Sequence, residues 1–98
     1  MDFEIRDPDI DHLYNENKGH EKYQTGVGKI VRRRIQTISG VPNERELYKF
    51  AGIRFEKLSG DRSHQRSMRI NKQWRLIVEI EEREEGNKMI VVGIEDYH

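Results

Sequence analysis

Cysteine is absent from this chain of 98 residues, and only two prolines and one tryptophan occur. Without cysteine the chain has neither a disulfide framework nor a thiolate zinc site, and nothing in it indicates an oxidising compartment. The N-terminal stretch MDFEIRDPDID is acidic and polar, so it has no apolar run long enough for a signal peptide or a membrane span. We therefore expect a cytoplasmic protein without a membrane segment.

Apolar residues are also few: 34% of the chain is hydrophobic, 37% is charged and the mean hydropathy is -0.97. A chain of this length suffices for one compact domain but not for two independent cores. The composition therefore predicts a single domain over residues 1–98 with a thin core, as in a sheet covered on one face.

An excess of either charge is missing as well, since 18 basic residues balance 18 acidic ones. The distribution is nevertheless uneven. Residues 1–21 and 77–98 each carry seven acidic and two basic side chains, whereas residues 22–50 and 51–76 each carry seven basic and two acidic ones. A local cationic field can hold a polyanion despite zero net charge, because distant exposed charges are screened by salt.

The N-terminal half shows helical patterns. Asp7-Pro8-Asp9 is typical of a helix start, and Asn17-Lys18-Gly19 of its end. Between Gln24 and Ser39, apolar residues recur at helical spacing, which predicts a longer amphipathic helix. One further helical turn or two is expected after Asn43.

After Gly52 the hydrophobic period changes from 3.6 to 2, the signature of strands. The predicted strands are 53–58, 65–70, 74–82 and 89–95, and residues 3–5 are a candidate edge strand. The expected fold class is α+β: an antiparallel meander in the C-terminal half, backed by two or three N-terminal helices.

Alternation assigns faces within these strands. Met68, Ile70, Trp74, Leu76 and Val78 should face the helices, which leaves Arg69 and Arg75 on the open face. Together with the terminal Asp96-Tyr97-His98, these arginines supply a proton acceptor, a proton donor and fixed cations, the groups that RNA cleavage needs. The ordinary alternative is solvated surface charge, because exposed arginines on sheets usually form weak ion pairs.

Other side chains favour structural roles. Trp74 could stack a base, but its place in an apolar row favours core packing. His12, His20 and His64 lie far apart in a chain without cysteine, so we expect neither a metal site nor a cofactor.

Four motifs occur in order over about residues 53–98: Leu58-x-Gly60-Asp61-Arg62, Ser67-x-Arg69-Ile70-Asn71, Trp74-Arg75 and Asp96-Tyr97-His98. This combination resembles the plasmid-maintenance killer proteins, the HigB-like branch of the RelE/ParE toxins. Residues 1–50 match only in the number and length of their helices.

The resemblance implies a small helix-backed sheet and a toxin that cleaves messenger RNA in the ribosomal A site through the 2′-hydroxyl, without a metal. It implies that Arg75 holds the scissile phosphate, that Arg69 assists and that Asp96, Tyr97 and His98 form the catalytic cluster, with His98 or Tyr97 as acid or base. The expected partner is a helix-turn-helix, HigA-like antitoxin, which alone contacts operator DNA. The other RNA-binding residues are expected in the central basic block: Arg54, Lys57, Arg62, Arg66 and Lys72.

One departure concerns the strand before the turn glycine, where HigB-like nucleases can carry a histidine and a lysine and this chain has Glu56 and Ser59. Two alternatives remain open at this point. ParE-like relatives share the fold but poison DNA gyrase, and an inactive homologue would serve only as an antitoxin-binding co-repressor. The terminal Asp96-Tyr97-His98 favours RNA chemistry.

Overall fold

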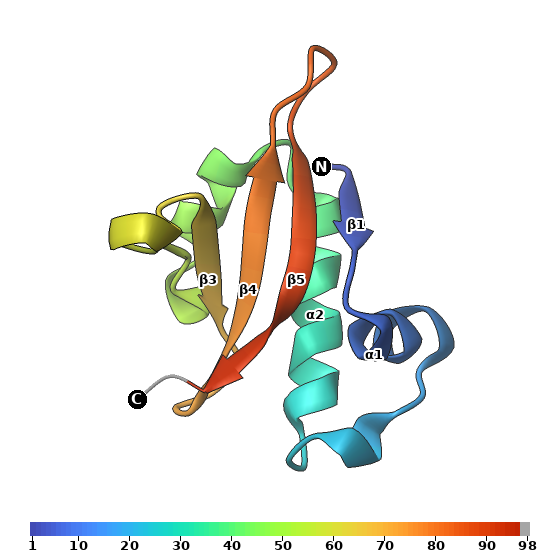
Figure 1. Cartoon of the computed structure of the whole chain (residues 1–98). Coiled ribbons are helices and arrows are strands. Elements are labelled where there is room, and N and C mark those ends of the chain that lie inside the picture. Colours follow the sequence, from blue (N-terminus) through green and yellow to red (C-terminus); the bar gives the residue numbers. More distant parts are fainter. Residues whose placement is uncertain (97–98) are drawn as a thin grey trace.

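The computed structural model describes residues 1–96 as one layer of sheet packed on helices (Figure 1). Within this range five strands form one sheet in the order β1-β5-β4-β3-β2. The strands are β1 (Phe3–Ile5), β2 (Glu56–Lys57), β3 (Gln65–Arg69), β4 (Trp74–Glu81) and β5 (Lys88–Asp96). The last four form the expected antiparallel meander, and β1 joins β5 in parallel.

The first helix begins where the sequence predicts it. The Asp7 carboxylate accepts hydrogen bonds from the backbone N–H groups of Asp9 and Ile10 at 2.9 and 3.2 Å, which satisfies the exposed helix end. Helix α1 (Pro8–Asp11) then continues as a π-helical turn over His12–Glu16. It ends at Asn17, whose φ of 53° is left-handed.

Helix α2 (Val27–Gly40) covers one face of the sheet and carries the core on one side. The sequence predicted a start at Gln24, but Gly26 has a φ of 88°, which a helix cannot include, so α2 begins directly after it. Spacing of four, four and three residues places its buried side chains in one row: Val27, Val31, Ile35 and Ile38.

The core lies between α2 and the sheet face predicted to meet it. Met68, Ile70, Leu76 and Val78 are buried there, as expected, and Trp74 is half-buried at the edge of the same cluster. Among residues 1–96, no helix combines the length and hydrophobicity needed to cross a bilayer.

One predicted strand is largely wrong. Instead of running over 53–58, the chain makes short 3₁₀ turns over Glu44–Lys49 and Ala51–Ile53, and only the two residues of β2 pair with β3. The cause is Arg54, whose φ of 43° and ψ of 59° are left-handed and interrupt any strand.

An irregularity in the β4–β5 pairing moves the end of β5. Ile77 pairs with Gly93 but Val78 pairs with Val91, so Val92 is an extra residue in β5. Strict alternation would place Glu95 on the same face as Val91, which lies in the core. After the bulge, Glu95 instead pairs directly with Arg75.

Candidate active site on the open sheet face

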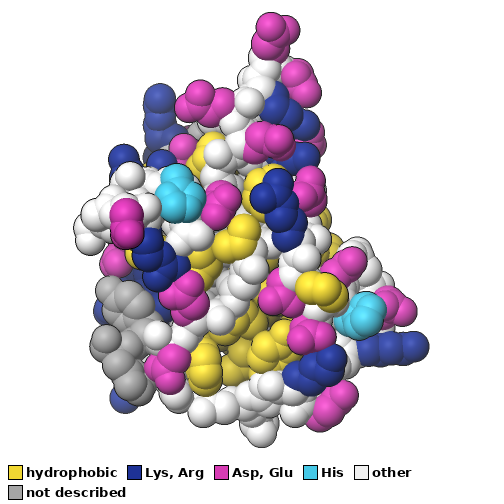
Figure 2. Space-filling model, in the orientation of Figure 1, with side chains coloured by type: hydrophobic (Ala, Val, Ile, Leu, Met, Phe, Trp, Pro, Cys, Tyr) yellow, Lys and Arg dark blue, Asp and Glu magenta, His cyan; other side chains and the backbone are white. Residues whose placement is uncertain are grey.

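The sheet face opposite α2 carries charged side chains of both signs around a hydrophobic area, as Figure 2 shows in the orientation of Figure 1. Arg75 lies on this face, as alternation predicted. It is not openly exposed, however, because only 5% of the residue is accessible. Arg75 is therefore a buried residue on the predicted face.

Polar groups of the protein hold Arg75 in place. Its Nε and Nη2 donate to the Ser67 hydroxyl oxygen at 3.2 and 2.8 Å, and Nη2 also donates to the Arg54 carbonyl at 2.8 Å. Ser67 is fully buried. Because the guanidinium is charged and desolvated, such hydrogen bonds are needed to offset the cost of its burial.

A carboxylate lies beside this arginine. Glu56 Oε2 is 3.6 Å from Arg75 Nη2, and 52% of the Glu56 side chain is exposed. Glu56 pairs with Ser67 across β2 and β3, so it lies on the Arg75 face, whereas Lys57 pairs with Arg66 on the other face. Lys57 therefore does not lie beside Arg75.

A second cluster borders the site. Arg62 donates to both carboxylate oxygens of Glu95 at 2.9 and 2.6 Å, and its Nε donates to Gln65 at 2.8 Å. The hydrogen bond to Glu95 is the main cause of a raised pKa for Arg62. This bidentate pair ties the 3₁₀ turn Gly60–Arg62 to the end of β5.

Arg69 lies directly opposite Arg75 across β3 and β4. Two cations in opposed positions repel each other, so their pairing raises the local positive potential at some cost in stability. Arg69 Nε donates to the Asn71 carbonyl at 3.3 Å. Lys72 is exposed in the turn that follows.

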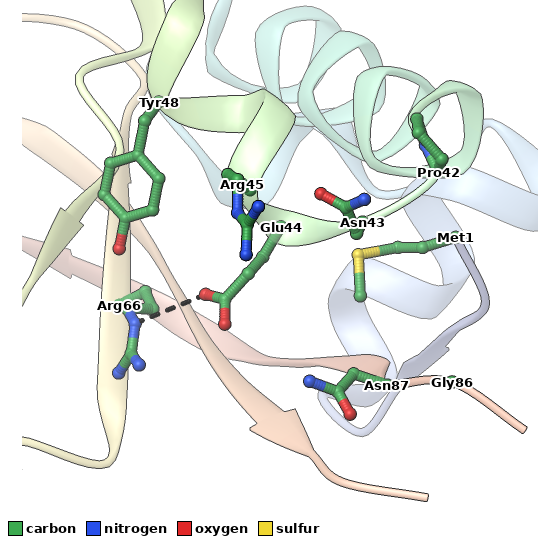
Figure 3. Close-up of a pocket in the computed structure, with 9 residues that line it drawn as sticks. All are labelled: Met1, Pro42, Asn43, Glu44, Arg45, Tyr48, Arg66, Gly86 and Asn87. Carbon is green, nitrogen blue, oxygen red and sulfur yellow. Dashed lines mark ion pairs between the residues drawn. The ribbon is translucent and has the colours of Figure 1, made fainter. Parts of the chain in front are cut away.

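Arg66 does not join this group. It pairs with Val78 on the core side of the sheet, and its Nε lies 3.6 Å from Glu44 Oε2. Figure 3 shows the two side chains facing each other. They line a hollow of about 500 Å³ together with Tyr48, Arg45 and Asn87. This hollow is separated from Arg75 by the thickness of the sheet.

The predicted site residues thus do not all lie together: Lys57 and Arg66 are on the other face, and Lys72 is in the exposed turn after β3. The structure brings Arg69 and Arg75 together, with Arg62 and the Arg54 carbonyl at their border. Asp96 ends β5 opposite Trp74 and accepts a hydrogen bond from Gln73 at 3.1 Å. Tyr97 and His98 lie outside the described residues.

Alternation placed Ser67 on this face together with Arg69 but did not single it out as a site residue, and Glu95 was missed. Ser67 occurs in the motif Ser67-x-Arg69-Ile70-Asn71 and alternates onto the Arg69 face, which was the available signal. Glu95 reaches the face only through the bulge at Val92, and alternation carries no signal for that.

Comparison with known proteins gives three results. The family model described as the RelE-like toxin of type II toxin-antitoxin system HigB matches residues 3–98. Toxin HigB-1 of Vibrio cholerae serotype O1 is 30% identical over 77 residues, which cover 79% of this chain and 81% of that protein. The solved structure of a YoeB/ParE toxin from Agrobacterium tumefaciens superposes over 100% of both chains with a TM-score of 0.64 and 18% identity.

Proposed function

The chain belongs to the RelE-like HigB toxins of type II toxin-antitoxin systems, and from this premise we propose that it inhibits translation as a ribosome-dependent messenger-RNA endonuclease. The observation that carries the proposal is the arginine fixed beside a carboxylate on the polar sheet face. Arg75 and Glu56, 3.6 Å apart, supply a fixed cation and a proton acceptor, two of the three kinds of group that cleavage of an RNA phosphodiester requires.

The proposed chemistry follows from these groups. A proton acceptor takes the proton of the ribose 2′-hydroxyl, whose oxygen attacks the adjacent phosphate, and a proton donor protonates the leaving 5′-oxygen. Arg75 stabilises the charge that develops on the phosphate oxygens. Glu56 is a candidate acceptor on this surface, and Asp96, Tyr97 and His98 are the acid-base candidates that the family resemblance supplies.

Access to Arg75 requires a side-chain movement, because the residue is only 5% exposed. Glu56 is half-exposed and belongs to the edge strand β2, so it can rotate away without disturbing the core. A phosphate would then take its place as the counter-ion of Arg75. Arg54, Lys57, Arg62, Arg66 and Lys72 remain proposed RNA contacts, of which Lys57 and Arg66 lie on the other face.

The proposed partners are the ribosomal A site with its messenger RNA and a HigA-like helix-turn-helix antitoxin, which would also link the toxin to operator DNA. The antitoxin itself is a family property of type II systems. The proposed location is the cytoplasm, where ribosomes are.

The test is cleavage of a defined messenger RNA by the purified protein, with and without programmed ribosomes. We expect cleavage only with ribosomes, and pulse labelling of cells that express the protein should show translation falling first. An early stop in DNA replication with intact messenger RNA would instead support a gyrase poison. Unchanged growth with retained antitoxin binding would support an inactive co-repressor.

A further inference from the structure

Ser67 and Arg54 both accept hydrogen bonds on one side of the Arg75 guanidinium. Ser67 Oγ accepts from Nε and Nη2, the side edge of the planar group, and the Arg54 carbonyl accepts from Nη2. Because the group is rigid and planar, fixing these two nitrogens also fixes the direction of Nη1. Ser67 is fully buried and therefore has little freedom to adopt another rotamer.

Both acceptors are neutral. A hydroxyl and a backbone carbonyl orient the guanidinium but leave its positive charge intact, whereas a buried carboxylate in the place of Ser67 would neutralise it. The carboxylate beside Arg75 is that of Glu56, which lies 3.6 Å from Nη2 and is half-exposed. The two neutral acceptors hold the guanidinium in a nearly dry position, where electrostatic interactions are stronger than in water.

The backbone at Arg54 adopts a costly conformation that presents the second acceptor. A non-glycine residue at a φ of 43° is less favourable than one in a right-handed conformation, because its Cβ approaches the following carbonyl oxygen. This turn directs the Arg54 carbonyl at Arg75 across a sequence separation of 21 residues. Strained backbone of this kind is concentrated at functional sites, where surrounding contacts maintain it.

We propose that Ser67, together with the left-handed carbonyl of Arg54, forms a neutral socket that orients Arg75 toward the scissile phosphate. Ser67 is then a positioning residue, since it acts on the reaction only through Arg75. The inference rests on the proposed nuclease function, but the socket itself makes a prediction that requires no cleavage.

The first measurement concerns the socket alone. Hydrogen exchange of the Arg75 Nε–H, followed by NMR, should be slow in the wild type, because that group is buried and bonded to Ser67. Ser67→Ala should accelerate the exchange. Equal exchange in both proteins would overturn the socket whether or not the protein cleaves RNA.

The second measurement concerns catalysis. Ser67→Ala should lower kcat for cleavage of ribosome-bound messenger RNA by about 10²-fold, the effect of a misplacement near 1 Å, with KM nearly unchanged. The neighbouring Met68→Ala is the matched control: Met68 is fully buried on the opposite face, so it should lower the melting temperature without changing kcat of the folded fraction.

A double-mutant cycle completes the test. In an Arg75→Ala background, Ser67→Ala should reduce kcat no further, because the residue that it positions is gone. Additive losses would overturn the inference and assign Ser67 an effect apart from Arg75. Absence of cleavage by the wild type would refute the proposed function, whereas cleavage that Ser67→Ala leaves unchanged would refute only the positioning role.

Discussion

Strands β3 and β4 present two faces that are both buried near their centre but differ in chemistry. Toward α2 lie Met68 and Leu76, each fully buried among apolar side chains. Directly next to them in sequence, Ser67 and Arg75 are buried on the opposite face through hydrogen bonds. Since a buried charge rarely stabilises a fold more than apolar packing does, the first face is built for stability, and the second retains polar groups that chemistry would use.

The largest effect is expected at His98, which the family resemblance assigns to the same catalytic site as Arg75. If His98 is the general acid or base, His98→Ala should lower single-turnover cleavage of a programmed ribosome by roughly 10²–10⁴-fold. Ribosome binding should survive, because only a proton-transfer group is lost. Cleavage at the wild-type rate would remove His98 from the proposed site and leave Glu56 as the first candidate.

Leu76→Ala tests the apolar face. Leu76 is fully buried, so truncation should cost about 2–5 kcal/mol of unfolding free energy through lost burial and a new cavity. Denaturant unfolding measures this cost, and cleavage per folded molecule should stay at the wild-type value. A loss of cleavage in fully folded Leu76→Ala would show that the two faces are not independent.

Arg75→Ala tests the neighbouring position on the polar face. Cleavage should fall by about 10²–10³-fold, the range seen when one donor to a developing negative charge is removed. The variant should also lose about 1–3 kcal/mol of stability, because Ser67 Oγ and the Arg54 carbonyl lose their buried partner. Thermal melts and single-turnover cleavage separate the two effects, and unchanged cleavage would contradict the role given to Arg75.

A smaller effect is expected on the stability of the fold at alkaline pH, through the ionisation of Tyr23. Burial, followed by the charges of Asp7 and Asp9, raises the pKa of Tyr23 from 10.0 to about 12. The unfolded chain therefore loses the phenol proton first, so this contribution to stability is complete below pH 10 and disappears as the pH rises toward 12. Phenolate absorbance and alkaline melts of the wild type and Tyr23→Phe measure it. An equal alkaline loss of stability in Tyr23→Phe would contradict the assignment.

The sequence predicted the features of the two sheet faces that depend on local periodicity. Apolar residues at period 2 identified β3, β4 and the core face, and the Asp7-Pro8 cap located the start of α1. Alternation also placed Arg69 and Arg75 on one face, because it describes side-chain direction within a strand.

Alternation does not describe how distant segments cover a face. The burial of Arg75 depends on the Arg54 carbonyl, which lies 21 positions earlier in the chain. Arg54 is left-handed although the sequence pattern around it is that of a strand, so the strand over 53–58 was predicted too long. The bulge at Val92 inserts one residue opposite β4, and no local pattern in β5 indicates it.

The smallest effect is expected at the rim of the polar face, in the ion pair of Arg62 and Glu95. The pair is bidentate with a shortest distance of 2.6 Å, but its side chains are 41% and 46% exposed, so water screens it and ordering two long side chains offsets the attraction. A double-mutant cycle with Arg62→Ala and Glu95→Ala should give a coupling free energy of about 0.2–1 kcal/mol that declines as salt is raised. Lys49→Ala and Glu46→Ala form the control pair, at 3.1 Å and with side chains 68% and 34% exposed. A coupling free energy well above this range that persists in high salt would contradict this prediction. It would show that the Arg62–Glu95 pair and the hydrogen bonds of Arg75 stabilise the polar face cooperatively.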